Sequence, residues 1–257
     1  MHERFLALWF PRLGAERWIR LGACGPAQPL VTVSPTGPGR TVECTSAAAA
    51  LAGVRPGMGI ADAFAVCCHL AVLPKDIVAE ARLLRALARL ARRRGLRADV
   101  SAPDGLVIHA GSGHTPERQL ATSLLDASAA AGLTARHGTA DTPAAASILA
   151  RQDGGAASVA DRIAPPGRTG EALASLPVAA LGLGPAAMRR LDRLGVRRIG
   201  EIGDWPDPAL RRYLGAEVAD RMQEALGRPQ STHGAEQGEG VVSFAARQRA
   251  QPAWRRA

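Results

Sequence analysis

The sequence is poor in aromatic residues, which make up only 4% of its 257 residues, while hydrophobic residues make up 47%. A chain of this length and composition is long enough for one large or two smaller domains, with a core built mostly from Ala, Leu and Val. No apolar run approaches the length of a membrane span, and the N-terminal residues show no signal-peptide pattern. We therefore expect a globular cytoplasmic protein with no membrane partner.

Cysteine spacings typical of a zinc site are also missing. The four cysteines are Cys24, Cys44, Cys67 and Cys68, without a C-x-x-C pair. Cys67 and Cys68 precede His69, but two adjacent thiols and a histidine lack normal zinc geometry, so we interpret these cysteines as small buried apolar side chains. The sequence predicts reduced thiols, no metal site and no cofactor.

Lysine is nearly absent. Lys75 is the only one, and arginine supplies the remaining positive charge. The net charge of +9 at pH 7 favours a polyanionic partner. A merely solvated basic surface is the alternative. The bias toward arginine and alanine also fits a GC-rich genome, so the bias alone carries no functional conclusion.

Short apolar runs alternate with helical patterns over the first two thirds of the chain. Strands are predicted over residues 5–10, 29–33, 40–45, 71–74, 106–109 and 133–140. Helices are predicted over residues 12–20, 47–52, 60–68, 76–95, 115–131 and 143–150, with Ser46 capping the second of them. Turns are expected at 37–39 and 111–113. The mixture predicts an α+β fold in which a sheet is interrupted by a compact insertion.

The predicted helix over residues 76–95 is the clearest amphipathic segment. Its expected apolar face consists of Ile77, Ala81, Leu84, Leu87 and Leu90. Its other face carries Arg82, Arg85, Arg89, Arg92 and Arg93. Such a charged face is usually solvated, and we prefer that interpretation to nucleic-acid contact.

The segment from Leu176 to Gly200 contains a short apolar helix, a tight turn over residues 182–185, and a second helix. Met188, Leu191 and Leu194 are expected on one face of the second helix. Glycines allow a close backbone approach, and the unpaired N–H groups at a helix start suit a phosphate. This is the helix-hairpin-helix plan for gripping a DNA backbone without reading bases; an ordinary helical hairpin is the alternative. The predicted DNA-contacting residues are Gly182, Leu183, Gly184, Arg189, Arg190 and Arg193.

In this order the segments resemble a Y-family DNA polymerase. Residues 52–58, AGVRPGM, resemble the family's fingers motif G-V-x-x-G-M, and residues 103–108 resemble the hairpin that bears its S-x-D-E pair. Residues 138–142 resemble its G-I-A-x-N/T segment, and residues 176–200 resemble its thumb. The resemblance covers about residues 5–227. Glycine- and proline-rich stretches at 154–155 and 165–167 indicate a domain boundary. The resemblance implies a palm at 1–25 and 73–165 and a fingers insertion at 26–72. It also implies an all-α helix-hairpin-helix thumb at 166–228, which a mobile basic tail at 229–257 follows.

The chain departs from the family where the chemistry resides. Two-metal nucleotidyl transfer needs clustered carboxylates. The family's D-x-D positions align with Trp9 and Pro11, and its D-E pair aligns with Asp104 and Gly105. Asp104, alone before a glycine, is interpreted as a turn former. The positions that contact the incoming triphosphate align with Ala47, Ala50 and Pro143. The resemblance therefore implies a polymerase-like protein without metal site or triphosphate grip.

This pattern, with the opening LWFPRL at residues 8–13, is similar to the ImuB branch of the family. That resemblance implies a catalytically inactive homologue in damage-induced mutagenesis, a scaffold that joins a RecA-like accessory protein (ImuA), an error-prone C-family polymerase and the sliding clamp on damaged DNA. The chain stops about where the family's little finger and C-terminal region begin, so we expect a short or truncated member. Residues 248–254 lack the spacing of a clamp-binding peptide, and clamp binding is not expected.

Two other functions are open at this point. One is an active divergent polymerase or another nucleotidyltransferase, with metal ligands drawn from Asp62, Asp99, Asp104 or Asp141. The other is a plain helix-hairpin-helix DNA-binding module whose N-terminal part only binds protein.

Overall fold

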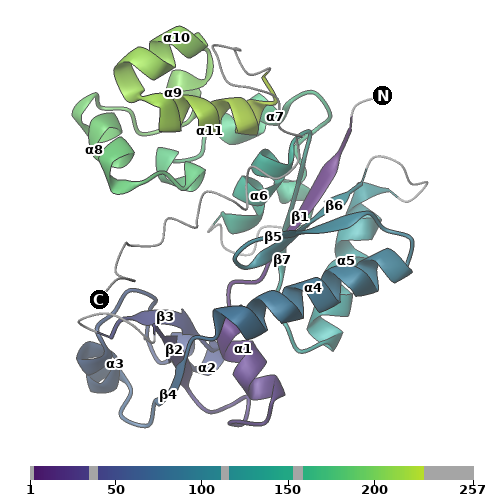
Figure 1. Cartoon of the computed structure of the whole chain (residues 1–257), viewed down its shortest axis with the longest axis vertical. Helices are drawn as coiled ribbons and strands as arrows, with labels where there is room; N and C mark the ends of the chain where they lie inside the picture. Colours follow the sequence, from purple (N-terminus) through teal and green to yellow (C-terminus); the bar gives the residue numbers. More distant parts are fainter. Residues whose placement is uncertain (1–2, 35–39, 111–115, 153–158, 229–257) are drawn as a thin grey trace, which may run out of the picture.

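The computed structural model describes residues 3–34, 40–110, 116–152 and 159–228, and over these residues the chain folds as an α+β protein (Figure 1). The predicted fold class is thereby confirmed. The predicted turns at 37–39 and 111–113, the glycine pair at 154–155 and the predicted tail at 229–257 lie outside the described residues. No helix in the described ranges is long and apolar enough to cross a membrane.

The central sheet is built around strand β1 (Phe5–Trp9), formed by the predicted apolar run. β1 lies between β6 (Gly105–His109) and β7 (Arg136–Ala140) and is antiparallel to both, while β5 (Ala98–Ser101) extends the sheet beyond β6. All residues of β1 except the last are buried, because helices cover both faces of the sheet.

Alternate side chains of β1 enter two separate cores. Helices α4 (Ile77–Arg93) and α5 (Glu117–Ala130) close the first core, which contains Leu6 and Leu8. Helix α6 (Pro143–Arg151) closes the second core together with the C-terminal helices. The sheet therefore has one face toward α4 and α5 and the other toward α6 and the C-terminal part.

A second, smaller sheet follows helix α1 (Leu13–Arg20) and lies at the opposite end of the molecule from the C-terminal helices (Figure 1). Its elements are β2 (Leu30–Val33), β3 (Val42–Thr45), α2 (Ala47–Leu51), α3 (Ile60–Val66) and β4 (Ala71–Pro74), with strand order β3-β2-β4.

Ser46 caps the N-terminus of α2, as predicted, because its hydroxyl accepts a hydrogen bond from the Ala49 N–H. β4 pairs with β2 as far as Pro74. The strand thus continues past the predicted boundary between residues 72 and 73, and the proposed division into palm, fingers and thumb stays a prediction.

The cysteines are all free thiols. Cys67 is buried in the core of the smaller sheet, as predicted. Cys68 is exposed, with its Sγ 3.0 Å from His69 Nδ1. The prediction of a buried side chain was wrong for Cys68, because α3 ends at Val66 and the chain that follows turns only Cys67 inward.

The named elements of the C-terminal part are all helical in its described residues. In order, it contains η1 (Val159–Arg162), α7 (Thr169–Ala174), the 3-10 turn η2 (Val178–Leu181), α8 (Pro185–Arg193), α9 (Gly200–Gly203), α10 (Asp207–Ala209), the π-helical turn η3 (Leu210–Leu214) and α11 (Ala216–Leu226). Buried side chains of these helices join those of α6 and β1 in one continuous core.

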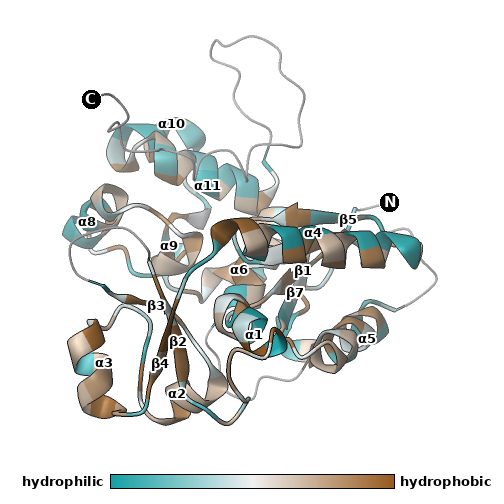
Figure 2. Cartoon of the chain, turned by 60° about the horizontal axis from the view of Figure 1, so that its bottom comes forward, coloured by the Kyte–Doolittle hydropathy of each residue, from teal (hydrophilic) through white to brown (hydrophobic). Residues whose placement is uncertain are grey.

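The buried face of α4 differs from the predicted one. Ile77 and Leu90 are 63% and 47% exposed. The buried residues are Glu80, Leu84, Ala88 and Ala91. The small alanines let the helix lie close to the sheet, and this packing turns Leu90 outward, so that hydrophobic and hydrophilic residues share the outer side of α4 (Figure 2). All five predicted arginines are exposed, so the charged face lies on the surface of the described structure, and its interpretation as merely solvated stays a prediction.

The apolar face of α8 is also shorter than predicted. Leu191 is fully buried and Met188 partly buried, but Leu194 is 53% exposed. The helix ends at Arg193, so Leu194 begins the following turn, and Ala187 completes the buried face instead.

Candidate functional site

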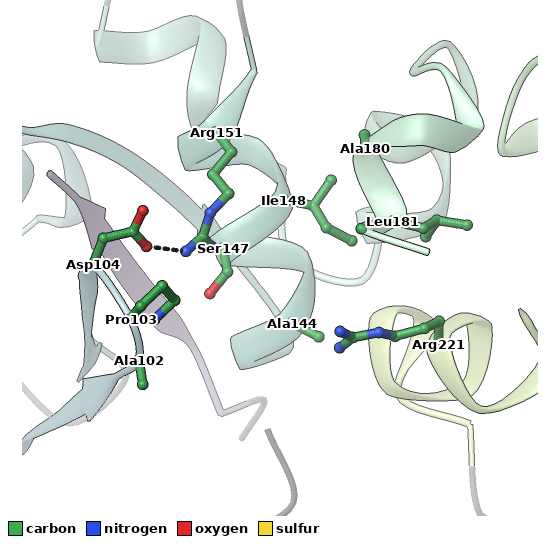
Figure 3. A pocket seen from close by; sticks show the side chains of 11 residues that line it. Ala102, Pro103, Asp104, Ala144, Ser147, Ile148, Arg151, Ala180, Leu181 and Arg221 are labelled. Carbon is green, nitrogen blue, oxygen red and sulfur yellow. Dashed lines mark hydrogen bonds and ion pairs between the residues drawn. The ribbon is translucent and has the colours of Figure 1, made fainter. Parts of the chain in front are cut away.

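The end of the central sheet brings together the positions that align with the family's metal ligands. Trp9 is the last residue of β1 and pairs with Gly105 on β6 and with Arg136 on β7. Asp104 lies in the turn just before β6. Its Oδ2 accepts a hydrogen bond from Trp9 Nε1 at 2.8 Å. Its Oδ1 accepts one from Arg151 Nη2 at 2.5 Å (Figure 3). Both oxygens of this carboxylate are therefore occupied by side chains of the chain itself.

Two arginines surround the Trp9 ring. The guanidinium carbons of Arg136 and Arg151 lie 5.4 and 5.9 Å from the ring centroid, within the range of cation–π attraction. With Asp104 the cluster carries two positive charges and one negative charge. Neither arginine was predicted from the sequence, because the one local signal, an indole N–H that needs an acceptor, points to Asp104 and not to a cation.

Gly105 occupies the position that aligns with the second residue of the family's D-E pair, and the structure leaves no room for a carboxylate side chain there. A Cβ atom there would lie 2.8 Å from the backbone oxygen of Leu8 and 3.3 Å from that of Ser101. Both neighbours are backbone atoms of paired strands, so they cannot swing aside. An acidic residue at position 105 would require β1 and β6 to move apart.

The positions that align with the triphosphate contacts offer no grip either. Ala47 and Ala50 lie on α2, and Pro143 is the first residue of α6, whose N-cap is Thr142.

A small pocket of about 80 Å³ beside Asp104 is bordered instead by Glu43, Glu80 and Lys75. Lys75 Nζ lies 3.0 Å from Glu43 Oε2. Burial raises the pKa of Glu80, despite the attraction of Lys75 and Arg17. Carboxyl groups on the wall and a lysine already paired make this pocket a poor site for an anionic triphosphate.

The four aspartates considered as metal ligands are dispersed, and the described residues contain no group of three or more His, Cys, Asp or Glu able to hold a metal ion. Asp62 lies beside Gly59 at the start of α3, and Asp99 pairs with Arg92. Asp104 and Asp141 are each bound to an arginine.

A larger pocket of about 260 Å³ links Asp104 to the C-terminal part (Figure 3). Asp104, Ser147 and Arg151 line one side of it, and Gly182 and Arg221 line the other. The pocket therefore joins Asp104 to the first predicted DNA-contacting glycine, Gly182.

The turn between η2 and α8 has the predicted backbone. Gly182 adopts the left-handed conformation, with φ of 66°, that favours glycine, and Gly184 is the N-cap of α8. The Gly184 N–H, however, donates to Glu217 Oε1 at 2.7 Å. The expectation of an unpaired N–H at this point was wrong, because α11 brings a carboxylate to the start of α8.

The three arginines of α8 have different surroundings. Arg190 Nη1 donates to the Leu214 carbonyl at 2.9 Å and lies directly against Gly215, so this side chain ties α8 to η3. Arg189 and Arg193 are exposed and have no ion pair within the described residues. Of the three, Arg189 and Arg193 are free to contact a phosphate.

Comparisons with known structures identify the fold. The chain matches a post-insertion binary complex of Dbh DNA polymerase with a TM-score of 0.71 at 18% identity, over 89% of this chain and 68% of that one. It matches a Y-family DNA polymerase chimera built on Dbh with a TM-score of 0.69 at 17% identity, over 92% and 70% of the two chains. DinB from Sulfolobus solfataricus gives a TM-score of 0.67 at 17% identity, over 87% and 67%. The described part of the chain thus has the fold of the Y-family DNA polymerases.

Sequence comparisons narrow the relationship. A family model described as the impB/mucB/samB family matches residues 26–151. Protein ImuB of Caulobacter vibrioides, from strain NA1000 / CB15N and from strain ATCC 19089 / CIP 103742 / CB 15, is 36% identical over 178 residues. The chain is an ImuB-type, Y-family polymerase-like homologue.

The match to ImuB covers 68% of this chain, but the chain spans only 38% of the length of these curated relatives. What the longer proteins do as wholes is therefore a matter of proposal for this ImuB-type chain. The resemblance found in its sequence, as a homologue of the Y-family polymerases, is confirmed.

Proposed function

We propose that this ImuB-type homologue binds DNA without catalysing nucleotidyl transfer, and that it serves as a scaffold in damage-induced, error-prone translesion synthesis. The observation that carries this proposal is Asp104, the one carboxylate left at the metal position, held between Trp9 Nε1 and Arg151 Nη2.

A divalent cation is disfavoured at this position by charge. Two-metal transfer requires clustered carboxylates to hold the ions beside the reacting oxygens. Here a metal ion would have to displace Arg151 from Asp104 and would lie close to a second guanidinium, that of Arg136, across the Trp9 ring. Like charges at such distances repel strongly where water is partly excluded.

DNA contact is supported by the fold shared with DNA polymerases and by the region around α8. The pocket beside Asp104 opens toward Gly182, and Arg189 and Arg193 are exposed on the same helical hairpin. Such contacts would position the backbone and carry no sequence information. A phosphate at the start of α8 would have to displace Glu217, which makes the exposed arginines the main source of affinity.

We infer the protein partners from the resemblance alone: a RecA-like accessory protein of the ImuA type and an error-prone C-family polymerase. Because DNA is the shared substrate, we place the assembly in the bacterial cytoplasm. The sliding clamp is not part of the proposal, since the segment considered for it, residues 248–254, lies outside the described residues.

The plain helix-hairpin-helix module is less well supported. Leu191 and Leu214 in the C-terminal part share one core with Ala146 and Leu149 of α6 and with Phe5 of β1. Residues 169–227 would expose this core if separated from the sheet, so they do not form an independent unit.

DNA binding is tested by the double variant Arg189→Gln/Arg193→Gln. Each phosphate contact contributes about 0.9 to the slope of log K against log salt concentration on duplex DNA. We therefore expect the slope to fall by roughly 1.8 and the affinity to fall alike on all sequences. Fluorescence anisotropy with labelled duplexes at several salt concentrations measures both.

Two further variants, neither of which should weaken DNA binding, serve as controls. Arg168→Gln removes a charge that is already paired with Glu171 on the surface and should leave the slope unchanged. Glu217→Gln removes the competing carboxylate at the start of α8 and should raise the affinity. A loss confined to particular sequences, or an unaltered slope in the double variant, would contradict the assignment of these arginines to phosphate contact.

A further inference from the structure

Helix α4 and the loop after it carry the largest concentration of unpaired positive charge among the described residues. Six of their arginines are exposed and have no ion pair within the described ranges. They are Arg82, Arg85, Arg89, Arg93, Arg94 and Arg97. Against a net charge of +9 for the whole chain, six such charges on one short stretch are the main source of the excess.

The exposed face also contains apolar side chains in line with these arginines. Val78, Arg82, Ala86, Arg89 and Arg93 follow one another at spacings of four, four, three and four residues, which places them on a single stripe about 22 Å long. Val78 is 59% exposed. The stripe therefore presents three cationic and two apolar side chains on the side of α4 that faces away from the sheet.

This surface lies on the opposite side of the central sheet from the proposed DNA contacts. α4 packs on the face of β1 that carries Leu6 and Leu8. Trp9 packs with the other core, which α6 and the C-terminal helices close. A DNA segment in the pocket between Asp104 and Gly182 would leave the outer side of α4 uncovered.

We propose that the outer face of α4 is a docking surface for an acidic, amphipathic helix of a protein partner. Charge complementarity requires carboxylates opposite Arg82, Arg89 and Arg93. The exposed Val78, at the start of the stripe, and the exposed Leu90, beside it, require apolar side chains next to those carboxylates. A sugar-phosphate backbone could pair with the arginines but would leave Val78 and Leu90 facing water, and the stripe has no aromatic side chain on which a base could stack. This inference rests on the proposed scaffold function. It gives the protein a second binding surface that does not overlap the proposed DNA contacts.

The test uses the full chain and a synthetic acidic helical peptide of about 20 residues, with leucines and glutamates spaced to match the stripe. Fluorescence anisotropy follows its binding to the wild type and to Arg82→Gln/Arg89→Gln/Arg93→Gln. Each exposed ion pair contributes a factor of about two to five, so we expect the triple variant to lose roughly tenfold in affinity. The matched control Arg55→Gln/Arg118→Gln/Arg212→Gln removes the same charge elsewhere and should stay within about twofold of the wild type.

Two further arms separate protein from DNA and from simple charge attraction. Val78→Ser/Leu90→Ser keeps all charges and should weaken peptide binding by about threefold or more. Saturating the protein with duplex DNA should leave peptide binding unchanged, because the two faces lie on opposite sides of the sheet. The proposal is overturned if both triple variants lose peptide affinity equally, if the apolar pair has no effect, or if DNA competes with the peptide. Failure of the wild type to bind duplex at all would instead refute the proposed DNA function and leave the peptide arm readable.

Discussion

Gly138→Ala is expected to destabilise the protein more than any other single methyl group added to a glycine in the described part of the chain. Gly138 lies on β7 where α6 crosses the sheet. A Cβ atom there would lie 2.5 Å from the Ala150 backbone nitrogen and 2.7 Å from Leu149 Cβ, and it would also collide with the Ala146 carbonyl oxygen. Helix α6 would have to lift from the sheet, so we expect a loss of about 3 kcal/mol or more in the free energy of unfolding.

Urea unfolding followed by circular dichroism measures this loss, with Gly203→Ala as the matched control. Gly203 ends α9, has no positive φ, and has nothing within 4 Å of an added Cβ. Alanine there should be neutral or slightly stabilising. Equal midpoints for the wild type and Gly138→Ala would show that α6 does not pack on β7 as closely as described.

Arg4→Met should cost about 3 kcal/mol of unfolding free energy. Arg4 is only 5% exposed, and its guanidinium bonds Glu117 Oε1 at 2.6 Å, Asp141 Oδ1 at 2.8 Å and the Ala164 carbonyl at 2.6 Å. Asp141 in turn accepts hydrogen bonds from Thr169 Oγ1 and the Gly167 N–H. Removing the arginine leaves two partly buried carboxylates without their cation, which is the costly way to break such a network.

The pH dependence of stability gives this prediction a second readout. Burial acts to raise the pKa of Asp141, but hydrogen bonds from Thr169, Arg4 and Gly167 outweigh it and lower the pKa below its ordinary value of 3.8. A carboxyl whose pKa is lowered by folding stabilises the protein above that value, and this contribution is lost as the pH falls through the folded-state pKa. The wild type should therefore lose stability as the pH falls below 3.8, and Arg4→Met should lose less over the same range.

Arg168→Met is the control for Arg4→Met, because Arg168 pairs with Glu171 on the surface, where both side chains are more than 60% exposed. Removing an exposed ion pair should leave the free energy of unfolding almost unchanged, because water screens the two charges. If Arg4→Met were as mild as Arg168→Met, the buried network would not hold the C-terminal part to the sheet.

The order of elements was predictable because the signals that define them are local. The apolar run at Phe5, the Ser46 cap and the Thr142 cap before Pro143 each depend on a few neighbouring residues. The phase of α4 was not predictable from its own sequence, because Ala88 and Leu90 compete for the sheet and only the packed structure shows that the alanine faces it.

The candidate site divides in the same way. The loss of carboxylates at Trp9 and Gly105 follows from alignment with a known motif. The pairing of Asp104 with Arg151 does not follow from such an alignment. Arg151 is 47 residues from Asp104 along the chain and reaches it only through the packing of α6. Glu217 meets Gly184 across a separation of 33 residues for the same reason. Partners brought together by tertiary structure leave no trace in local spacing.

Primer extension with Mg²⁺ and with Mn²⁺, on undamaged and lesion-containing templates, decides whether the protein catalyses nucleotidyl transfer, with DNA binding measured on the same samples. We expect DNA binding with no added nucleotide under any of these conditions, because Asp104 is bound to Trp9 and Arg151 and the other aligned positions, Trp9, Pro11 and Gly105, carry no carboxylate. Extension by the wild type that disappears in Asp104→Ala would contradict the account and show that Asp104 holds a catalytic metal.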